Sequence, residues 1–218
     1  MRPASAASEA GFERAFAAMP VVAILRGLGP DEALAVGEAL VEAGISIIEV
    51  PLNSPQPLES IKRLVATFGE RASIGAGTVL DPGSVDAVAA VGGQIIVSPN
   101  TDAAVIRRTR DLGLVSLPGC LTPTEAFAAL GAGAHAVKLF PGELVTPAVA
   151  KAMAAVLPKD TRLLVVGGVS ADTIEDWHGS VVAGFGIGSS LFRPGLPAAD
   201  IGEKAARLVE AVRRFKAG

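Results

Sequence analysis

The chain repeats one pattern eight times: a short apolar run ends in a turn with glycine or proline, and a segment with helical spacing follows. Strands that are apolar at nearly every position are typical of a parallel sheet whose outer side is covered by helices. Eight such units predict an α/β fold, a closed (β/α)8 TIM barrel with a short N-terminal helix. The predicted strands are Val21–Leu25, Ile45–Val50, Ala72–Ala76, Gln94–Ser98, Leu114–Leu117, Gly133–Pro141, Arg162–Val166 and Val181–Ile187.

Start and stop signals, mainly proline before and glycine after an amphipathic stretch, place the helices. An open, doubly wound sheet is the alternative architecture, and the absence of a Gly-x-Gly-x-x-Gly loop at the first helix disfavours it. No linker or change of composition divides the 218 residues, so we expect residues 1–218 to form one domain. The predicted helices are Glu9–Met19, Asp31–Ala43, Pro57–Phe68, Pro82–Val91, Thr101–Leu112, Pro123–Leu130, Thr146–Leu157, Ala171–Trp177 and Ala198–Phe215.

Composition excludes several classes of protein. Half of the residues are hydrophobic, yet no apolar run approaches the roughly 20 residues that cross a membrane. The net charge is −3 with scattered basic residues, so neither nucleic acid nor an anionic membrane is expected as a partner. The single cysteine, Cys120, and an amino terminus without the apolar core of a signal peptide predict a cytoplasmic protein. With two histidines in the chain, no zinc cluster is expected.

Lys138 is the most unusual residue of the predicted strands, because apolar residues occupy the positions on both sides of it. Strand alternation places Ala136, Lys138 and Phe140 on one face. Burial would favour the neutral amine, which is the form that attacks a ketone, so we predict that Lys138 forms a Schiff base. The alternative is a lysine whose ammonium reaches solvent from the end of the strand.

Polar side chains gather where the predicted strands end, which is where barrel enzymes place their chemistry. Glu49 ends the second strand, Arg26 follows the first, Thr78 the third and Asn100 the fourth. A carboxylate among isoleucines is unfavourable unless it is paired or used. Glu49 is therefore a second candidate catalytic residue, and a structural ion pair with Arg26 or Lys138 is the alternative.

The last two strands run into glycine-rich turns, at Gly167-Gly168 and at Gly188-Ser189. Glycine lets backbone N–H groups approach phosphate oxygens, and barrels commonly bind phosphate after strands seven and eight, beside the start of a short extra helix. A lysine that binds an electrophile, together with a phosphate cradle, suggests a phosphorylated keto-sugar as substrate.

Seven motifs between about Val21 and Leu191 resemble, in order and spacing, those of the metal-independent class I aldolases of 2-keto-3-deoxy-6-phosphosugar acids. They are Ile-Leu-Arg-Gly at 24–27, Ile-Glu-Val-Pro-Leu-Asn-Ser-Pro at 48–55, Gly-Ala-Gly-Thr-Val-Leu at 75–80, Val-Ser-Pro-Asn at 97–100, Pro-Gly-Cys at 118–120, Val-Lys-Leu-Phe-Pro at 137–141 and Val-Gly-Gly-Val at 166–169. The resemblance implies a lyase without a cofactor, with Lys138 as the Schiff-base residue and Glu49 acting through a water. It also implies a homotrimer.

The resemblance implies that Arg26 and Thr78 hold the substrate carboxylate and that the two glycine turns hold the phosphate. The expected substrate-binding residues are Arg26, Thr78, Pro99, Val166, Gly167, Gly168, Gly188 and Ser189.

Within the family, Pro51, Asn53 and Val166 look like the galactonate-type enzymes, because gluconate-type enzymes carry threonine, arginine and threonine there. The implied reaction is cleavage of 2-dehydro-3-deoxy-6-phospho-D-galactonate to pyruvate and D-glyceraldehyde 3-phosphate. Residues 141–146 depart from the family, which has a small residue after Phe-Pro. The alternatives are an enzyme for the C4 epimer or for both epimers, another phosphate-binding barrel enzyme, and a binding module without activity.

Overall fold

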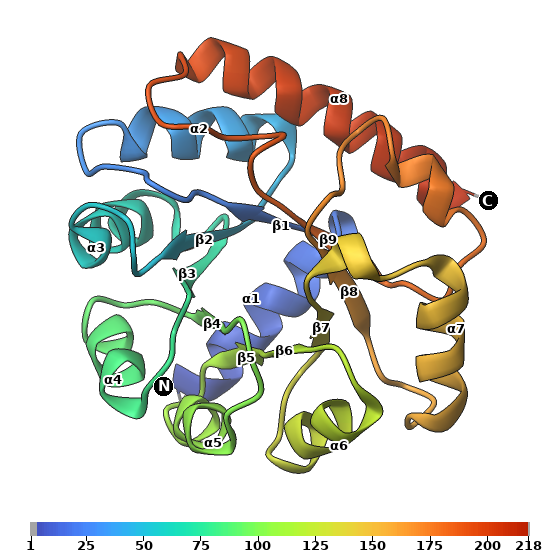
Figure 1. Ribbon diagram of the computed structural model, residues 1–218. Helices are drawn as coiled ribbons and strands as arrows, with labels where there is room; N and C mark the ends of the chain where they lie inside the picture. The colour runs from blue at the N-terminus through green and yellow to red at the C-terminus, as the bar shows by residue number, and fades with distance from the viewer. Residues whose placement is uncertain (1–3, 218) are drawn as a thin grey trace.

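The computed structural model describes residues 4–217, and it is a ring of parallel strands surrounded by helices (Figure 1). The sheet order within this part of the chain is β5-β4-β3-β2-β1-β9-β8-β7-β6, and every pair is parallel. Most strands begin later than predicted, the last at Gly184 rather than Val181. The strands are β1 Val21–Ile24, β2 Ile47–Pro51, β3 Ser73–Gly77, β4 Ile95–Val97, β5 Val115–Leu117, β6 Gly119–Cys120, β7 Val137–Leu139, β8 Leu163–Val166 and β9 Gly184–Ile187.

The two outermost strands of this order, β5 and β6, are halves of one chain segment that is interrupted at Pro118. β5 pairs with β4, and β6 pairs with β7. Proline has no N–H to donate, but the Pro118 carbonyl accepts the Lys138 N–H at 2.9 Å, and the Ser116 carbonyl accepts the His135 N–H at 3.0 Å. The segment therefore joins both neighbours and closes the ring. The predicted (β/α)8 barrel is confirmed, with a fifth strand that runs on to Cys120.

The helices begin largely where the sequence signals them. Proline occupies the first turn of four helices, where its missing N–H is harmless. Side chains of Asp81, Asp102, Thr122 and Thr146 accept backbone N–H groups at helix starts. None of the helices within residues 4–217 has the length and apolar character needed to span a membrane. The α-helices are α1 Ala4–Ala18, α2 Ala33–Ala43, α3 Pro57–Phe68, α4 Pro82–Ala90, α5 Ala103–Asp111, α6 Pro123–Gly131, α7 Pro147–Val156 and α8 Ala198–Ala217.

The unit after β8 lacks the α-helix predicted over Ala171–Trp177. Only a short 3-10 helix, η2 (Ile174–Trp177), forms there. The Thr173 hydroxyl accepts the Ser170 N–H at 2.9 Å, and the Ser170 hydroxyl accepts the Asp172 N–H at 3.3 Å. Hydroxyls that bond to nearby backbone groups compete with helical hydrogen bonds. The prediction was wrong because these side chains hold the start of the segment in a turn.

The core has two layers, one between the strands and the outer helices and one inside the barrel. Phe12 and Phe16 of α1 belong to the inner layer, and their rings are 5.5 Å apart. Glu13 of the same helix holds Arg162, at the start of β8, through two hydrogen bonds of 2.6 and 2.7 Å. Figure 1 shows α1 lying across the ring. It closes the end of the barrel where the strands begin, so the open end is the one where they finish.

Strand alternation places the predicted catalytic side chains inside the barrel. Ile47 and Ala136 belong to the inner core layer, whereas Ile48 and Val137 belong to the outer one. Glu49 and Lys138 follow two residues after Ile47 and Ala136, so their side chains point inward as well.

Candidate active site

Lys138 and Glu49 lie together at the bottom of the open end of the barrel. Both line a small cavity of about 10 Å³ whose other walls include Leu117 and Leu164. Their side chains are almost fully buried, at 7% exposed for Lys138 and 3% for Glu49. The alternative of a lysine that reaches solvent is therefore wrong.

Two glycines make room for this pair. A Cβ at Gly77 of β3 would overlap the carboxylate of Glu49, and a Cβ at Gly119 of β6 would overlap the backbone of Pro99 and come within 3.1 Å of the Lys138 Cε. Each glycine is thus required by a close approach and not by a turn. The Gly-Ala-Gly-Thr and Pro-Gly-Cys motifs owe part of their composition to this packing.

The electrostatics of the pair are dominated by burial. Desolvation lowers the pKa of Lys138 to about 8; the Glu49 carboxylate opposes this shift and the Arg26 guanidinium adds to it. Desolvation likewise raises the pKa of Glu49 to about 7, although the positive charges of Lys138 and Arg26 act to lower it. Near neutral pH, both groups are therefore close enough to their pKa values to exchange protons with a substrate.

Neither side chain is held in a structural ion pair within residues 4–217. Glu49 Oε2 is buried without a hydrogen-bond partner. The Lys138 Nζ lies 4.7 Å from the centroid of the Phe140 ring, and Arg26 donates to Asn53 Oδ1 at 2.8 Å. The alternative interpretation of Glu49, an ion pair with Arg26 or Lys138, does not describe this structure. A buried carboxylate oxygen without a partner is costly, which is typical of a group that binds or reacts.

A larger cavity of about 480 Å³ opens above the pair. Its walls include six of the predicted substrate-binding residues, namely Arg26, Val166, Gly167, Gly168, Gly188 and Ser189. The two cavities share Ile24, Val166 and Gly186 in their walls, so the amine and the glycine turns lie along one opening.

The glycine turns have residues with positive φ and backbone N–H groups without an acceptor among the described residues, which the predicted anion cradle requires. Gly167 and Gly168 both have positive φ, at 113° and 69°, a conformation that favours glycine. Their N–H groups, with that of Ser189, donate no hydrogen bond within the described part of the chain. The short extra helix expected after the last strand is instead a single turn, in which the Gly188 carbonyl accepts the Leu191 N–H at 2.9 Å.

Thr78 and Pro99 follow β3 and β4 at the same end of the barrel, but the walls of the two cavities do not include them. Thr78 has a φ of 56°, which is a genuine outlier for a β-branched residue and is found most often at functional sites.

Sequence reasoning missed two charged residues of the larger cavity, Glu143 and Arg193. Arg193 follows the Gly188-Ser189 turn and donates to the Ser189 carbonyl at 3.2 Å. Glu143 belongs to the short 3-10 helix η1 (Gly142–Leu144), directly after β7. The signal in the sequence was their position, because Glu143 lies four residues after the end of β7 and Arg193 six residues after the end of β9.

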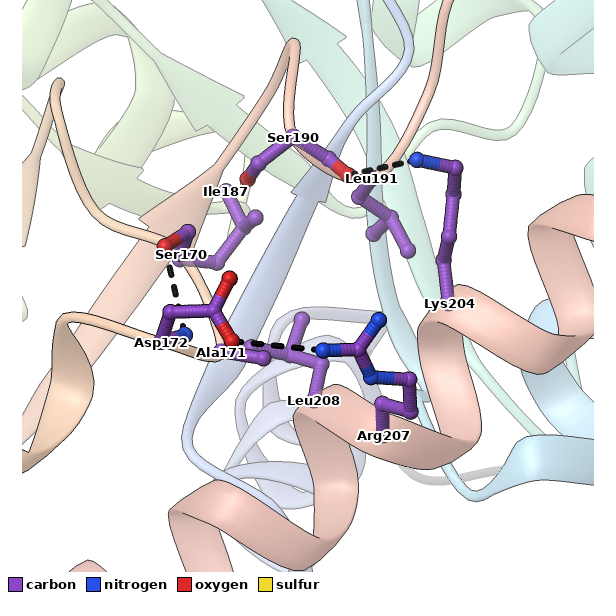
Figure 2. A pocket seen from close by; sticks show the side chains of 9 residues that line it. All are labelled: Ser170, Ala171, Asp172, Ile187, Ser190, Leu191, Lys204, Arg207 and Leu208. Atoms are coloured by element: carbon purple, nitrogen blue, oxygen red, sulfur yellow. Dashed lines mark hydrogen bonds and ion pairs between the residues drawn. The ribbon is translucent and has the colours of Figure 1, made fainter.

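A third cavity, of about 110 Å³, lies behind the glycine turns against α8 (Figure 2). The Lys204 Nζ contacts the Ser190 carbonyl at 3.5 Å, and Arg207 pairs with Asp172 at 3.2 Å (Figure 2). Ser190 also lines the larger cavity. These contacts tie the loops after β8 and β9 to α8, so they support the cradle from behind. Separately, residues 4–217 contain no group of three or more His, Cys, Asp or Glu side chains placed to hold a metal ion.

Comparisons with known proteins identify the family of the chain. The family described as "Aldolase: KDPG and KHG aldolase" matches residues 12–202. The 2-dehydro-3-deoxy-6-phosphogalactonate aldolase of Escherichia coli (strain K12) is 48% identical over 195 residues, which are 89% of this chain and 95% of that one. The solved structure titled "Native KDPGal structure" has a TM-score of 0.90 at 46% identity and covers 92% of this chain and 97% of its own.

A second solved structure is a cube-shaped protein cage that was designed by fusing symmetric oligomeric domains. It has a TM-score of 0.89 at 47% identity, and the match covers 91% of this chain and 74% of that one. Because the family model matches residues 12–202 and a relative at 48% identity covers 89% of the chain, the chain belongs to the KDPG and KHG aldolase family, whose members are class I aldolases and hence lyases.

Proposed function

We propose that this aldolase cleaves 2-dehydro-3-deoxy-6-phospho-D-galactonate to pyruvate and D-glyceraldehyde 3-phosphate, with Lys138 as the Schiff-base residue. One observation carries the proposal: a buried amine with a lowered pKa lies in the same opening as a cradle of free backbone N–H groups. An amine reacts with a ketone, and a cradle of N–H groups binds a phosphate.

In the proposed reaction, the neutral amine of Lys138 attacks the C2 ketone, and loss of water gives an iminium. The iminium accepts the electron pair of the C3–C4 bond as that bond breaks. Glu49 takes the proton of the C4 hydroxyl through a water, so that the aldehyde forms and leaves. The unpaired Oε2 of Glu49 and its pKa of about 7 suit a group that takes this proton and returns it to C3 of the enamine. Hydrolysis then frees pyruvate.

The remaining assignments rest on the layout of the opening and, for Thr78 and Pro99, on the resemblance to the family. Arg26, above Lys138, would bind the substrate carboxylate with Thr78, and Pro99 would contact the substrate beside the lysine. The cradle residues Gly167, Gly168, Gly188 and Ser189 would bind the phosphate through their N–H groups.

The preference for the galactonate epimer rests on Val166 and on the loop after β2. Val166 lines both cavities, between the lysine and the cradle, and has no hydroxyl to bond a sugar oxygen. The Asn53 Oδ1 accepts a hydrogen bond from the Arg26 guanidinium at 2.8 Å, and the Ser54 hydroxyl accepts the Gly27 N–H at 2.9 Å. The loop thus fixes the position of Arg26. The relative from Escherichia coli, at 48% identity, carries the galactonate name.

Cleavage of the two pure C4 epimers, with pyruvate release followed, tests this proposal. We expect kcat/KM for the galactonate epimer to exceed that for the gluconate epimer by about tenfold or more, because a missing hydroxyl partner weakens one epimer selectively. The variant Val166→Thr adds a hydroxyl with almost no change of volume, and it should move the ratio toward the gluconate epimer. Equal rates on both epimers in both proteins would contradict the assignment, and they would identify an aldolase for both substrates.

We also propose that residues 1–218 form one aldolase domain and that the chain assembles as a homotrimer. The cage built from symmetric oligomeric domains supports assembly in a related chain. Leu121 and Phe127, at the start and in the middle of the α6 unit, expose 37% and 49% of their surfaces and offer apolar contacts. Light scattering should give three times the mass of the chain, and a monomer would refute the trimer. The cytoplasmic location stays a prediction.

A further inference from the structure

Arg193 is a second cation in the walls of the 480 Å³ cavity, and it is bound to the backbone of the cradle. Its Nε donates to the Ser189 carbonyl at 3.2 Å. The N–H of the same Ser189 is one of the cradle groups that have no acceptor within the described residues. The guanidinium therefore lies beside the N–H groups on which a phosphate would be bound.

The loop that carries Arg193 is fixed on both sides of this residue. On one side, Phe192 is buried, and the Gly188 carbonyl accepts its N–H at 3.0 Å. On the other side, Pro194 packs against Gly27, where an added Cβ would lie 2.6 Å from the Pro194 Cγ. The position of the guanidinium is thus largely set before any ligand binds, which lowers the entropy lost on binding.

The terminal N–H groups of Arg193 are available to a ligand. Only its Nε has an acceptor within residues 4–217, and Glu143, the carboxylate in the same walls, forms no ion pair with it. A guanidinium keeps its charge when it donates to a neutral carbonyl, and its planar terminal groups suit two parallel hydrogen bonds to phosphate oxygens.

Arg26 and Arg193 act at different ends of the opening. Arg26 is close enough to the reacting pair to lower the pKa of both Lys138 and Glu49, whereas Arg193 is not among the charges that shift either pKa. Arg193 is held instead at Ser189 of the cradle. A substrate with a carboxylate next to its ketone and a phosphate at its other end would meet one guanidinium at each end.

We propose that Arg193 is a specificity-determining residue, which binds the substrate phosphate through its terminal N–H groups and makes the enzyme prefer a phosphorylated keto-sugar acid to one that ends in a hydroxyl. The inference rests on the proposed function and deepens it, because the substrate-binding residues expected from the sequence do not include Arg193. A terminal hydroxyl can still bond to the cradle N–H groups, but it carries no charge and gains little from the guanidinium.

Kinetics of Arg193→Gln and Arg193→Lys on the phosphorylated substrate and on its dephosphorylated form test the proposal. We expect kcat/KM for the phosphorylated substrate to fall about tenfold to a hundredfold in Arg193→Gln, the usual effect of losing hydrogen bonds to a charged group. The fall should come mainly from a higher KM, and kcat/KM for the dephosphorylated form should stay within about twofold of the wild type. Arg193→Lys should lie between the two, because a single nitrogen keeps the charge but not the planar fork.

The matched control is Arg213→Gln, which removes an exposed arginine of α8 that lines neither cavity. Its kinetics on both substrates should equal those of the wild type. Pyruvate carries no phosphate, so its covalent trapping on Lys138 by borohydride should be unchanged in Arg193→Gln, which shows that the site is intact.

Binding of inorganic phosphate, measured by calorimetry, tests Arg193 without turnover. The affinity should fall about tenfold or more in Arg193→Gln and stay unchanged in Arg213→Gln. Phosphate affinity and kcat/KM within about twofold of the wild type would overturn the role of Arg193, and so would an equal loss on both substrates, which would mark a structural residue. If the wild type cleaves neither substrate, the proposed function fails, while the phosphate measurement still decides whether Arg193 binds the anion.

Discussion

Replacement of Lys138 by methionine will lower aldol cleavage by about 10⁴-fold or more, because no other amine of residues 4–217 lines the two cavities to form the iminium. Methionine keeps a long unbranched side chain in the apolar wall formed by Leu117 and Leu164. It also removes an amine whose lowered pKa reports that its charged form is unfavourable in the fold. The thermal stability of Lys138→Met should therefore equal or exceed that of the wild type.

The matched control for this variant is Lys151→Met, which changes an exposed lysine of α7 in the same way. Its rate should be unchanged. Steady-state kinetics with pyruvate release, together with a melting curve for each protein, separate loss of chemistry from loss of folding. A folded Lys138→Met that keeps more than about one hundredth of the wild-type rate would rule out the Schiff-base assignment.

Replacement of Glu49 by glutamine will lower kcat by about 10² to 10⁴, the usual contribution of a group that moves protons in the transition state. Glutamine keeps the shape of the side chain in the space left by Gly77. The amine of Lys138 remains, so pyruvate should still bind covalently. A variant that turns over at the wild-type rate would contradict the proposed role of Glu49.

The pH dependence of Glu49→Gln carries a second signature. Activity of the wild type should rise with pH as Lys138 loses its proton, around its pKa of about 8. The Glu49 carboxylate raises that pKa, so its removal should move the rising limb to lower pH. The pKa of Glu49 in the folded protein lies above the ordinary pKa of a glutamate. The wild type therefore loses stability as the pH rises from the ordinary pKa to the raised one. Glu49→Gln lacks this loss and should melt at a higher temperature than the wild type at pH 8.

Much of the fold could be predicted because its rules are local. Apolar runs, with proline before and glycine after the helical stretches, were enough to place most of the strand–helix units and to give the face on which Lys138 and Glu49 lie. The conformation of the segment after β8 was predicted wrongly, because the Ser170 and Thr173 hydroxyls hydrogen-bond to its backbone and the spacing of apolar residues gives no sign of such bonds. The extension of the fifth strand past Pro118 was also not predicted. A proline normally ends a strand, but here the Pro118 carbonyl accepts a sheet hydrogen bond from Lys138.

The sequence predicted which strand ends carry the residues of the site, but it did not predict the contacts that these residues make. Strand alternation predicts that Lys138 and Glu49 share one cavity. It does not predict their pKa values, because desolvation and their mutual attraction shift these values in opposite directions and the balance depends on how completely the barrel buries both groups. Arg193 and Glu143 lie on loops whose course no local pattern gives. Thr78 and Pro99 lie at the expected end of the barrel, but the walls of the two cavities do not include them.

The central claim is that a single buried amine forms the covalent bond to substrate. The most direct measurement is reduction of the enzyme with borohydride in the presence of pyruvate, followed by mass mapping of its peptides. The proposed chemistry predicts one added three-carbon group, located on Lys138 and absent from Lys138→Met. A label on another lysine, or none in a wild type that cleaves the substrate, would contradict it.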